Sequence, residues 1–192
     1  MPVELHSPRK PRDVCIVVDG YSSGRFLIEE LHTQEWDLVG IQSSLDLADF
    51  WLTQFDKSMY VHTIQHKTLK ETVAELDGFN VKAVFAGSEP GVILSEELQD
   101  HFGIPGNGSE TTMWRREKFD MQERLRDCGV RAIRQCESGD VEELICWQKQ
   151  WGVWPVIIKP PMSGGTDGVY WCHNEQDVHF LKKIQLREIL QM

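Results

Sequence analysis

The sequence lacks any apolar run long enough to cross a membrane. Its longest apolar runs are residues 14–18 and 153–158, whereas a spanning helix needs about 20 apolar residues. Residues 9–12, Arg-Lys-Pro-Arg, precede the first run, but that run is too short to serve as the apolar core of a signal peptide. We therefore predict no membrane segment and no export signal.

Cysteine is sparse and shows no pairing pattern. The five cysteines stand at positions 15, 128, 136, 146 and 172, with no CxxC pair. An odd total without a regular spacing argues against a disulfide framework. We expect reduced thiols, most of them small core residues, in a cytoplasmic protein.

Basic residues are the minority among the charged ones. The chain of 192 residues carries 20 Lys and Arg against 30 Asp and Glu, which gives a formal net charge of −10. Nucleic acid recruits clustered basic residues, so this balance makes a nucleic-acid partner unexpected. Hydrophobic residues at 41% and charged residues at 26% are ordinary for a folded globular chain.

The first half of the chain alternates between strand-like and helix-like segments. Buried-type apolar runs are followed by amphipathic stretches, which predicts a doubly wound parallel sheet, a Rossmann-like α/β domain. We assign residues 1–12 to a flexible tail and residues 13–108 to this domain. The expected strands are 14–18, 38–41, 59–62 and 81–86, and the expected helices are 26–31, 45–55, 69–76 and 92–102.

Turn residues are dense over 103–109, and a second domain is expected over 109–192. Its pattern is α+β. Helices are expected over 113–128 and 140–150, strands over 130–135, 153–159 and 169–172, and a last helix from Asn174 to the end of the chain.

The loop after the first strand reads Gly20-Tyr21-Ser22-Ser23-Gly24. It matches the G-x-S-x-G pattern of a hydrolase nucleophile elbow, but that motif needs an oxyanion loop earlier in the chain, and only 19 residues precede this one. Two other interpretations stay open. The loop is either a turn that caps a helix or an anion site beside backbone amides.

A second loop, between residues 159 and 169, is rich in glycine. A buried-type strand ends at Lys159, two prolines follow, and then come Ser163, Gly164, Gly165, Thr166, Asp167 and Gly168. Glycines let backbone amides approach phosphate oxygens, and hydroxyls add donors. The loop is neither a Walker A loop nor a dinucleotide fingerprint. It is either a lid over phosphates or a mobile hairpin without a ligand.

Lys118 has an unexpected position on its predicted helix. It falls on an apolar stripe with Trp114, Met121, Leu125 and Cys128. A lysine there either snorkels to solvent or meets an anion. His62 and His66 are four residues apart but have no acidic partner at a fitting spacing, so we predict no metal site.

Together these pieces resemble the front part of an ATP-grasp ligase, most closely the carboxylate–amine ligases that join L-amino acids. The resemblance runs from Asp13 to Asp177. It is carried by the loops at 19–25 and 87–92, by Gly106-Asn107, by 115–118 with Met121 and Gly129-Val130, and by 155–160 with 163–169. Their order and spacing are more specific than any single piece.

The resemblance implies a pre-ATP-grasp domain followed by an incomplete ATP-grasp domain. It implies ATP as cofactor, with phosphate contacts from Lys118, Lys159 and the loop residues Ser163, Gly164, Gly165, Thr166 and Gly168. It places Ser22, Ser23, Gly24 and Glu89 on possible substrate-side loops. The family also uses Mg²⁺, but its metal ligands, adenine-gripping strand and acyl-phosphate Arg are expected beyond these residues, so no catalytic residue is assigned.

The family's reaction phosphorylates a carboxylate with ATP, and an amine then displaces the phosphate. We therefore expect an ATP-binding portion of such a ligase, which acts on an amino-acid-like carboxylate only when completed. Because the chain stops before the family's metal site, it is expected to be truncated, split or degenerate. The alternative is a non-catalytic interaction module, covered by a C-terminal partner chain or by a second copy in a homodimer.

Overall fold

The structure is a computed structural model that describes residues 11–47, 49–164, 166, 168–181 and 188–191. It forms two compact units that divide between Thr112 and Met113, a few residues after the turn-rich segment. Most of the predicted tail, residues 1–10, lies outside the described residues, while Arg12 already belongs to the first strand. None of the described helices combines the length and apolar character needed to span a bilayer.

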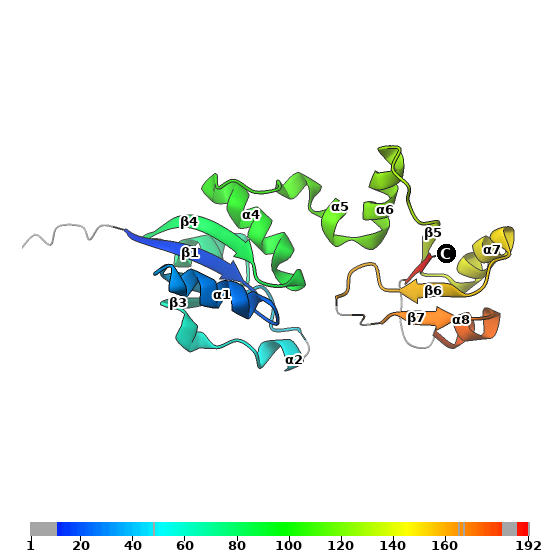
Figure 1. The fold of residues 1–192 in the computed structure, drawn as a ribbon, viewed down its shortest axis with the longest axis horizontal. Coiled ribbons are helices and arrows are strands. Elements are labelled where there is room, and N and C mark those ends of the chain that lie inside the picture. Colours follow the sequence, from blue (N-terminus) through cyan, green and yellow to red (C-terminus); the bar gives the residue numbers. More distant parts are fainter. Residues whose placement is uncertain (1–10, 48, 165, 167, 182–187, 192) are drawn as a thin grey trace, which may run out of the picture. The chain divides into compact units, whose positions relative to one another are not determined.

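The first unit is a parallel α/β sandwich (Figure 1). Its four strands lie in the order β3-β2-β1-β4, and all neighbours are parallel, which confirms the doubly wound fold. Its elements are β1 (Arg12–Val18), α1 (Gly24–Thr33), β2 (Leu38–Gln42), α2 (Asp49–Leu52), η1 (Lys57–Met59), β3 (His62–Gln65), α3 (Leu69–Glu75), β4 (Phe79–Ala86), η2 (Glu89–Gly91), α4 (Val92–Phe102) and η3 (Ser109–Thr111).

The parallel sheet is buried on both faces. Alternate residues of β1 point to opposite sides, so Ile16 packs with α3 and α4 while Val17 packs with α1. This two-sided burial explains why β1 reads as a continuous apolar run rather than an alternating one. The carboxyl ends of β1 and β4 then carry the two glycine-containing loops to one edge of the sheet.

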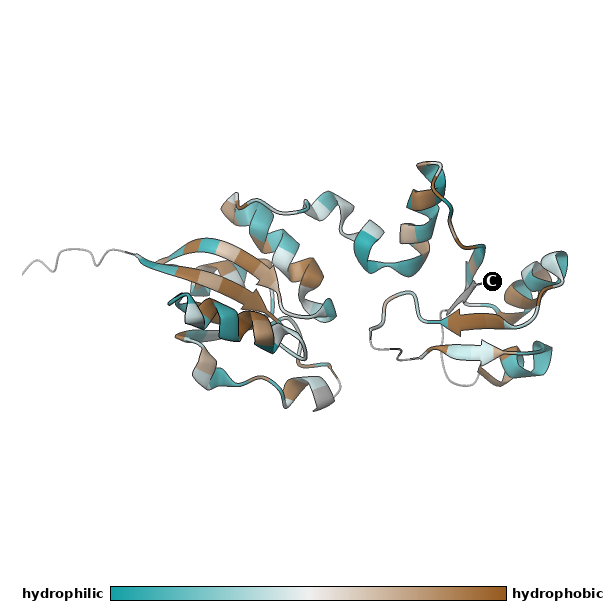
Figure 2. Ribbon diagram, viewed as in Figure 1, coloured by the Kyte–Doolittle hydropathy of each residue, from teal (hydrophilic) through white to brown (hydrophobic). Residues whose placement is uncertain are grey.

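The second unit holds a four-stranded sheet in the order β5-β8-β6-β7 with antiparallel pairing throughout. Residues of α7 and α8 pack on β6 and β7 to form one apolar cluster. Figure 2 shows β6 coloured mainly as hydrophobic. Its elements are α5 (Met113–Arg116), α6 (Lys118–Asp127), β5 (Gln135–Ser138), α7 (Val141–Trp151), β6 (Val156–Lys159), β7 (Tyr170–Cys172), α8 (Glu175–Leu181) and β8 (Glu188–Gln191).

Local capping signals set several helix ends. Thr68 accepts a hydrogen bond from the backbone N–H of Glu71 (3.2 Å) at the start of α3, and Asp140 accepts one from Glu142 (3.0 Å) at the start of α7. Helices α4 and α7 end at Gly103 and Gly152, both in the left-handed conformation that favours glycine.

Three segments differ from the prediction. The expected helix 45–55 is limited to the single turn α2. The expected helix 113–128 is broken at Glu117, whose extended backbone and capping carboxylate start a new helix. The expected strand 130–135 begins only at Gln135, because residues 131–134 are extended without ladder pairing.

The end of the chain also differs. The predicted last helix begins as expected, since the Asn174 side chain accepts a hydrogen bond from the Asp177 backbone N–H (3.1 Å), but it ends at Leu181. Residues 188–191 instead form β8, which pairs with both β5 and β6. The central place in this sheet gives the segment two ladders of backbone hydrogen bonds, which the helix would forgo.

Candidate phosphate site and substrate-side loops

Lys118 is held against the glycine-rich loop of the second unit. Its backbone N–H donates to the Pro161 carbonyl (3.1 Å). Its ammonium group donates to the carbonyl and the hydroxyl of Ser163 (2.9 and 3.1 Å) and lies 3.4 Å from the Pro161 carbonyl. The lysine therefore does not reach an apolar core. It contacts the segment that sequence analysis singled out for phosphate.

The predicted apolar stripe around Lys118 is not formed. The helix breaks at Glu117, so Trp114 and Lys118 belong to different helices. Trp114 is 42% exposed, Cys128 is exposed, and no residue of α6 is buried. The alignment assumed for one continuous helix therefore fails.

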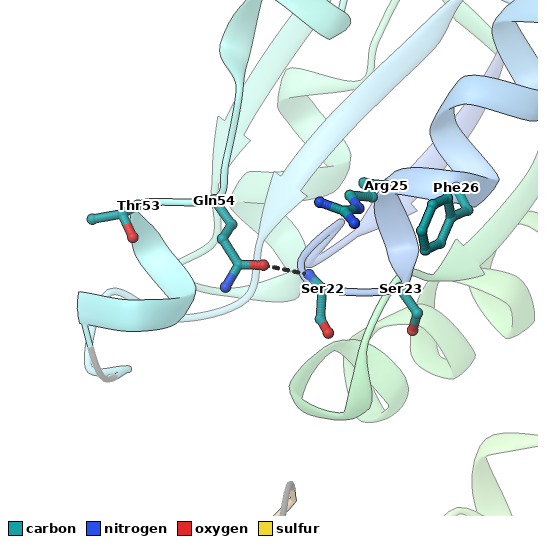
Figure 3. A pocket seen from close by; sticks show the side chains of 6 residues that line it. All are labelled: Ser22, Ser23, Arg25, Phe26, Thr53 and Gln54. Carbon is teal, nitrogen blue, oxygen red and sulfur yellow. Dashed lines mark hydrogen bonds between the residues drawn. The ribbon is translucent and has the colours of Figure 1, made fainter.

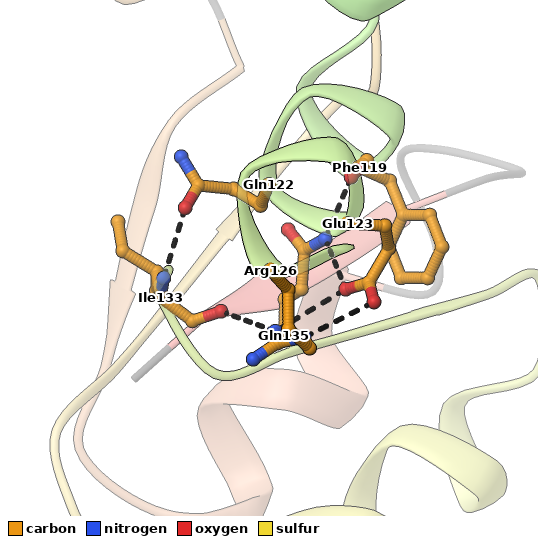
Figure 4. Close-up of polar contacts among 6 residues, drawn as sticks. All are labelled: Phe119, Gln122, Glu123, Arg126, Ile133 and Gln135. Carbon is orange, nitrogen blue, oxygen red and sulfur yellow. Dashed lines mark hydrogen bonds and ion pairs between the residues drawn. The ribbon is translucent and has the colours of Figure 1, made fainter. Parts of the chain in front are cut away.

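Helix α6 is fixed to β5 by a polar network (Figure 4). The Gln135 amide donates to the Phe119 carbonyl (2.8 Å) and to the Glu123 carboxylate (2.9 Å). Arg126 pairs with Glu123 (3.2 Å) and donates to the Ile133 carbonyl (2.9 Å). These contacts hold the helix whose first residue is Lys118.

Lys159 is the last residue of β6 and leads directly into the same loop. Its side chain is half-buried, and burial lowers the pKa of its ammonium group, while the nearby Glu117 carboxylate partly raises it again. Glu117 directly precedes Lys118 and is 8% exposed. One buried carboxylate thus lies beside one lysine in sequence and acts on the other through space.

The loop itself joins the two lysines. Ser163 and Gly164 are half-buried, Thr166 is exposed with a φ of 64°, and Gly168 has a φ of 68°. Gly165 and Asp167 lie outside the described residues. Two ammonium groups beside a glycine-containing loop form an arrangement suited to phosphate oxygens.

The substrate-side loops of the first unit pack backbone against backbone. A Cβ at Gly24 would lie 2.4 Å from the Gly87 carbonyl oxygen, so only glycine permits this approach. The Ser88 hydroxyl donates to the Asp19 carbonyl (2.7 Å), which ties the second loop to the first. The structure thereby brings the Ser22–Gly24 loop together with the loop that carries Glu89, whose side chain is exposed.

Asp19 is a buried group that sequence analysis assigned to no role. It is 0% exposed and accepts hydrogen bonds from the backbone N–H of Ser43 (2.8 Å) and from its hydroxyl. Burial raises the pKa of its carboxyl, and the Ser43 bonds oppose that rise. The carboxyl therefore links the ends of β1 and β2 rather than facing a ligand.

Ser22 has the contacts of a loop residue, not of a nucleophile. Its φ is 51°, and its backbone N–H donates to the Gln54 side-chain oxygen (2.8 Å). Among the described residues, no histidine shares a hydrogen bond with it, so the hydrolase interpretation gains no support.

Within the part of the chain that the structure describes, no group of three or more His, Cys, Asp and Glu side chains is arranged to hold a metal ion. His62 lies 4.0 Å from Glu75, and the His66 ring bonds to the Thr72 hydroxyl (2.8 Å). Both histidines thus have polar partners on α3 or immediately after β3.

No protein-family model matches the sequence. Among characterised proteins, the chain is 31% identical over 169 residues to dapdiamide A synthase of Enterobacter agglomerans, covering 85% of this chain and 39% of that protein. It is 25% identical over 91 residues to the L-arginine-specific L-amino acid ligase of Bacillus subtilis, covering 47% and 22%. The chain thus spans well under half the length of these relatives.

Solved structures show the same fold. The N5-carboxyaminoimidazole synthetase of Staphylococcus aureus complexed with ADP superposes with a TM-score of 0.71 at 14% identity, covering 95% of this chain and 48% of that one. The L-amino acid ligase of Bacillus licheniformis gives 0.67 at 13% identity, covering 95% and 44%. The chain is therefore a relative of the ATP-grasp amino-acid ligases and resembles the N-terminal portion of them.

Proposed function

We propose that the second unit binds the phosphates of ATP through Lys118, Lys159 and the loop Ser163–Gly168. The observation that carries this proposal is the bonding of the Lys118 ammonium group to Ser163, next to the half-buried Lys159. Both cations serve the same loop. A triphosphate offers anionic oxygens that replace the Ser163 oxygens as partners of Lys118.

The reaction that this site would serve is ligation of a carboxylate to an amine, as in the amino-acid ligases to which the chain is similar. ATP would supply the phosphoryl group that activates the carboxylate. The two lysines would hold the transferring phosphate oxygens and balance their charge. The loops at Ser22–Gly24 and Glu89 would shape the substrate side. The described residues offer no Mg²⁺ ligand set, so we assign no step to the metal.

Isothermal calorimetry with ATP and Mg²⁺ tests the proposal. Lys159→Ala is expected to weaken ATP binding about tenfold or more, since a charged hydrogen bond contributes about 1.5–3 kcal/mol. Lys149→Ala is the matched control, because Lys149 lies in the same unit but is exposed and paired with Glu175 (3.1 Å). Absent or millimolar ATP binding that Lys159→Ala leaves unchanged would overturn the proposal for this chain.

A second candidate function is a non-catalytic interaction module. It is favoured by large apolar side chains that remain exposed on the second unit, among them Trp171 (62%) and Phe180 (65%). The occupant of that surface would be a partner chain or a second copy. Light scattering after size-exclusion chromatography separates these cases, because a monomer that binds ATP favours the first function and a dimer that does not bind it favours the second.

A further inference from the structure

A cavity of about 550 Å³ opens in the first unit beside the start of α1 (Figure 3). Its volume falls within the range of about 300–1,000 Å³ that is usual for small-molecule pockets. One wall comes from the first turn of α1 and the loop before it, and the other comes from the segment after α2. The lining residues are Ser22, Ser23, Arg25, Phe26, Thr53 and Gln54.

The two walls are joined by a hydrogen bond. The Ser22 backbone N–H donates to the Gln54 side-chain oxygen (2.8 Å) and keeps Ser22 at a φ of 51°. A non-glycine residue in this conformation costs about 1–2 kcal/mol, and such strain collects at ligand-binding loops. The hydroxyls of Ser22 and Ser23 project to the same side of the loop (Figure 3).

Arg25 brings a positive charge to this cavity. Its guanidinium group lies 4.7 Å from the centre of the Phe26 ring and extends toward Gln54 (Figure 3). In the described ranges it forms no ion pair with a carboxylate. A guanidinium group is charged at every physiological pH, and its planar fork matches a carboxylate with two parallel hydrogen bonds.

Negative charge borders a smaller cavity on the other side of Arg25. This cavity of about 220 Å³ shares Arg25 and Gln54 with the larger one. Its lining also includes the carboxylates of Glu29 and Asp56 and the apolar side of Met59. Positive and negative groups therefore lie around one connected hollow.

We propose that this pair of cavities binds a small α-amino acid as its zwitterion. The ligand's carboxylate would lie on Arg25 with the Ser22 and Ser23 hydroxyls, and its ammonium group would face Glu29 and Asp56. A phosphate dianion fits less well, because two carboxylates oppose one guanidinium. The ligand class deepens the proposed ligase function and rests on it for its catalytic meaning, but the binding itself is independent of ATP.

Calorimetry on the full chain tests the proposal, with L-alanine as the probe. Propionate, ethylamine and inorganic phosphate are titrated separately as ligands that lack one half of the zwitterion or carry the wrong charge. We expect L-alanine to bind more tightly than any of the three. Arg25→Gln is expected to weaken L-alanine binding about tenfold or more while ATP binding stays unchanged. Lys159→Ala should do the reverse.

Arg12→Gln is the matched control, since Arg12 lies in the same unit but pairs with Asp37, and it should leave L-alanine binding unchanged. The inference is overturned if L-alanine does not bind, if Arg25→Gln binds it as well as the wild type does, or if phosphate binds more tightly than L-alanine. Loss of L-alanine binding with normal ATP binding would sink only this inference. Loss of ATP binding with normal L-alanine binding would sink only the phosphate site.

Discussion

The two units differ in how completely they bury their apolar residues. In the first unit, helices cover both faces of a parallel sheet, and two separate clusters result. In the second unit, residues of α7 and α8 build one cluster with the antiparallel strands. The first unit thus has two layers of packing to stabilise it and the second has one.

Exposed apolar side chains follow the same division. Among the described residues, three large ones are exposed in the first unit, Phe26, Leu45 and Val61. The second unit exposes Met113, Trp114, Val130, Ile133, Trp151, Val153, Met162, Trp171 and Phe180. Apolar surface of that extent marks a place where a protein meets something else. The comparison teaches that the first unit has the more self-contained core.

The largest expected effect comes from emptying one core at a time. Leu98→Ala in the first unit and Leu144→Ala in the second remove side chains that are 0% and 1% exposed. Each should lower the free energy of unfolding of its own unit by about 2–5 kcal/mol. Hydrogen exchange read by mass spectrometry should localise the loss of protection to α4 and β4 in one case and to α7 and β6 in the other.

The matched control is Val130→Ala, because Val130 is 52% exposed and should change protection little in either unit. If Leu98→Ala exposes both units equally, the two units unfold as one body and the comparison between them fails.

A somewhat smaller effect is expected where the loops of the first unit touch. An added Cβ at Gly87 would lie 2.6 Å from the Gly20 Cα and 2.8 Å from the Asp19 carbonyl oxygen, both of them backbone atoms. Gly87→Ala should therefore cost about 1–3 kcal/mol, as overpacking does. Urea denaturation followed by circular dichroism measures the loss.

Gly103→Ala separates crowding from conformational strain. Gly103 has a φ of 63° and no atom within 4 Å of an added Cβ, so its cost should be only about 1 kcal/mol. A Gly103→Ala variant that is less stable than Gly87→Ala would show that the contact between the two loops is loose.

Much of the fold could be predicted from the sequence, because the apolar runs of β1 and β4 are buried and the caps of α3 and α7 are local. Local signals failed where distant contacts decide. The break at Glu117 depends on a side chain that accepts the Asp120 backbone N–H (2.6 Å), and β8 depends on two partner strands. Lysines at motif positions were visible in the sequence. Arg25 and Gln54 were not, since only the tertiary fold brings α1 beside the segment after α2.

The smallest effect concerns two carboxyls whose pKa values shift in opposite directions. Burial raises the pKa of Asp19 in the first unit. Its neutral form is the better tolerated one, so the folded unit should gain stability as pH falls from neutral through that raised pKa toward the unfolded value of about 3.9. Hydrogen bonds from Arg126 and then Gln135 lower the pKa of Glu123 in the second unit. That contribution is present above the unfolded value of about 4.3 and is lost as pH falls below it.

Urea denaturation and hydrogen exchange at pH 7, 5 and 4 should therefore reveal opposite slopes in the two units. Asp19→Asn should flatten the slope of the first unit, and Glu123→Gln that of the second. The Glu123 effect should stay below about 1 kcal/mol and shrink in high salt, because the pair with Arg126 is solvent-exposed. Equal slopes in the two units, unchanged by either substitution, would mean that neither carboxyl distinguishes the folded from the unfolded state. In that case the electrostatic part of the contrast between the units would have to come from other groups.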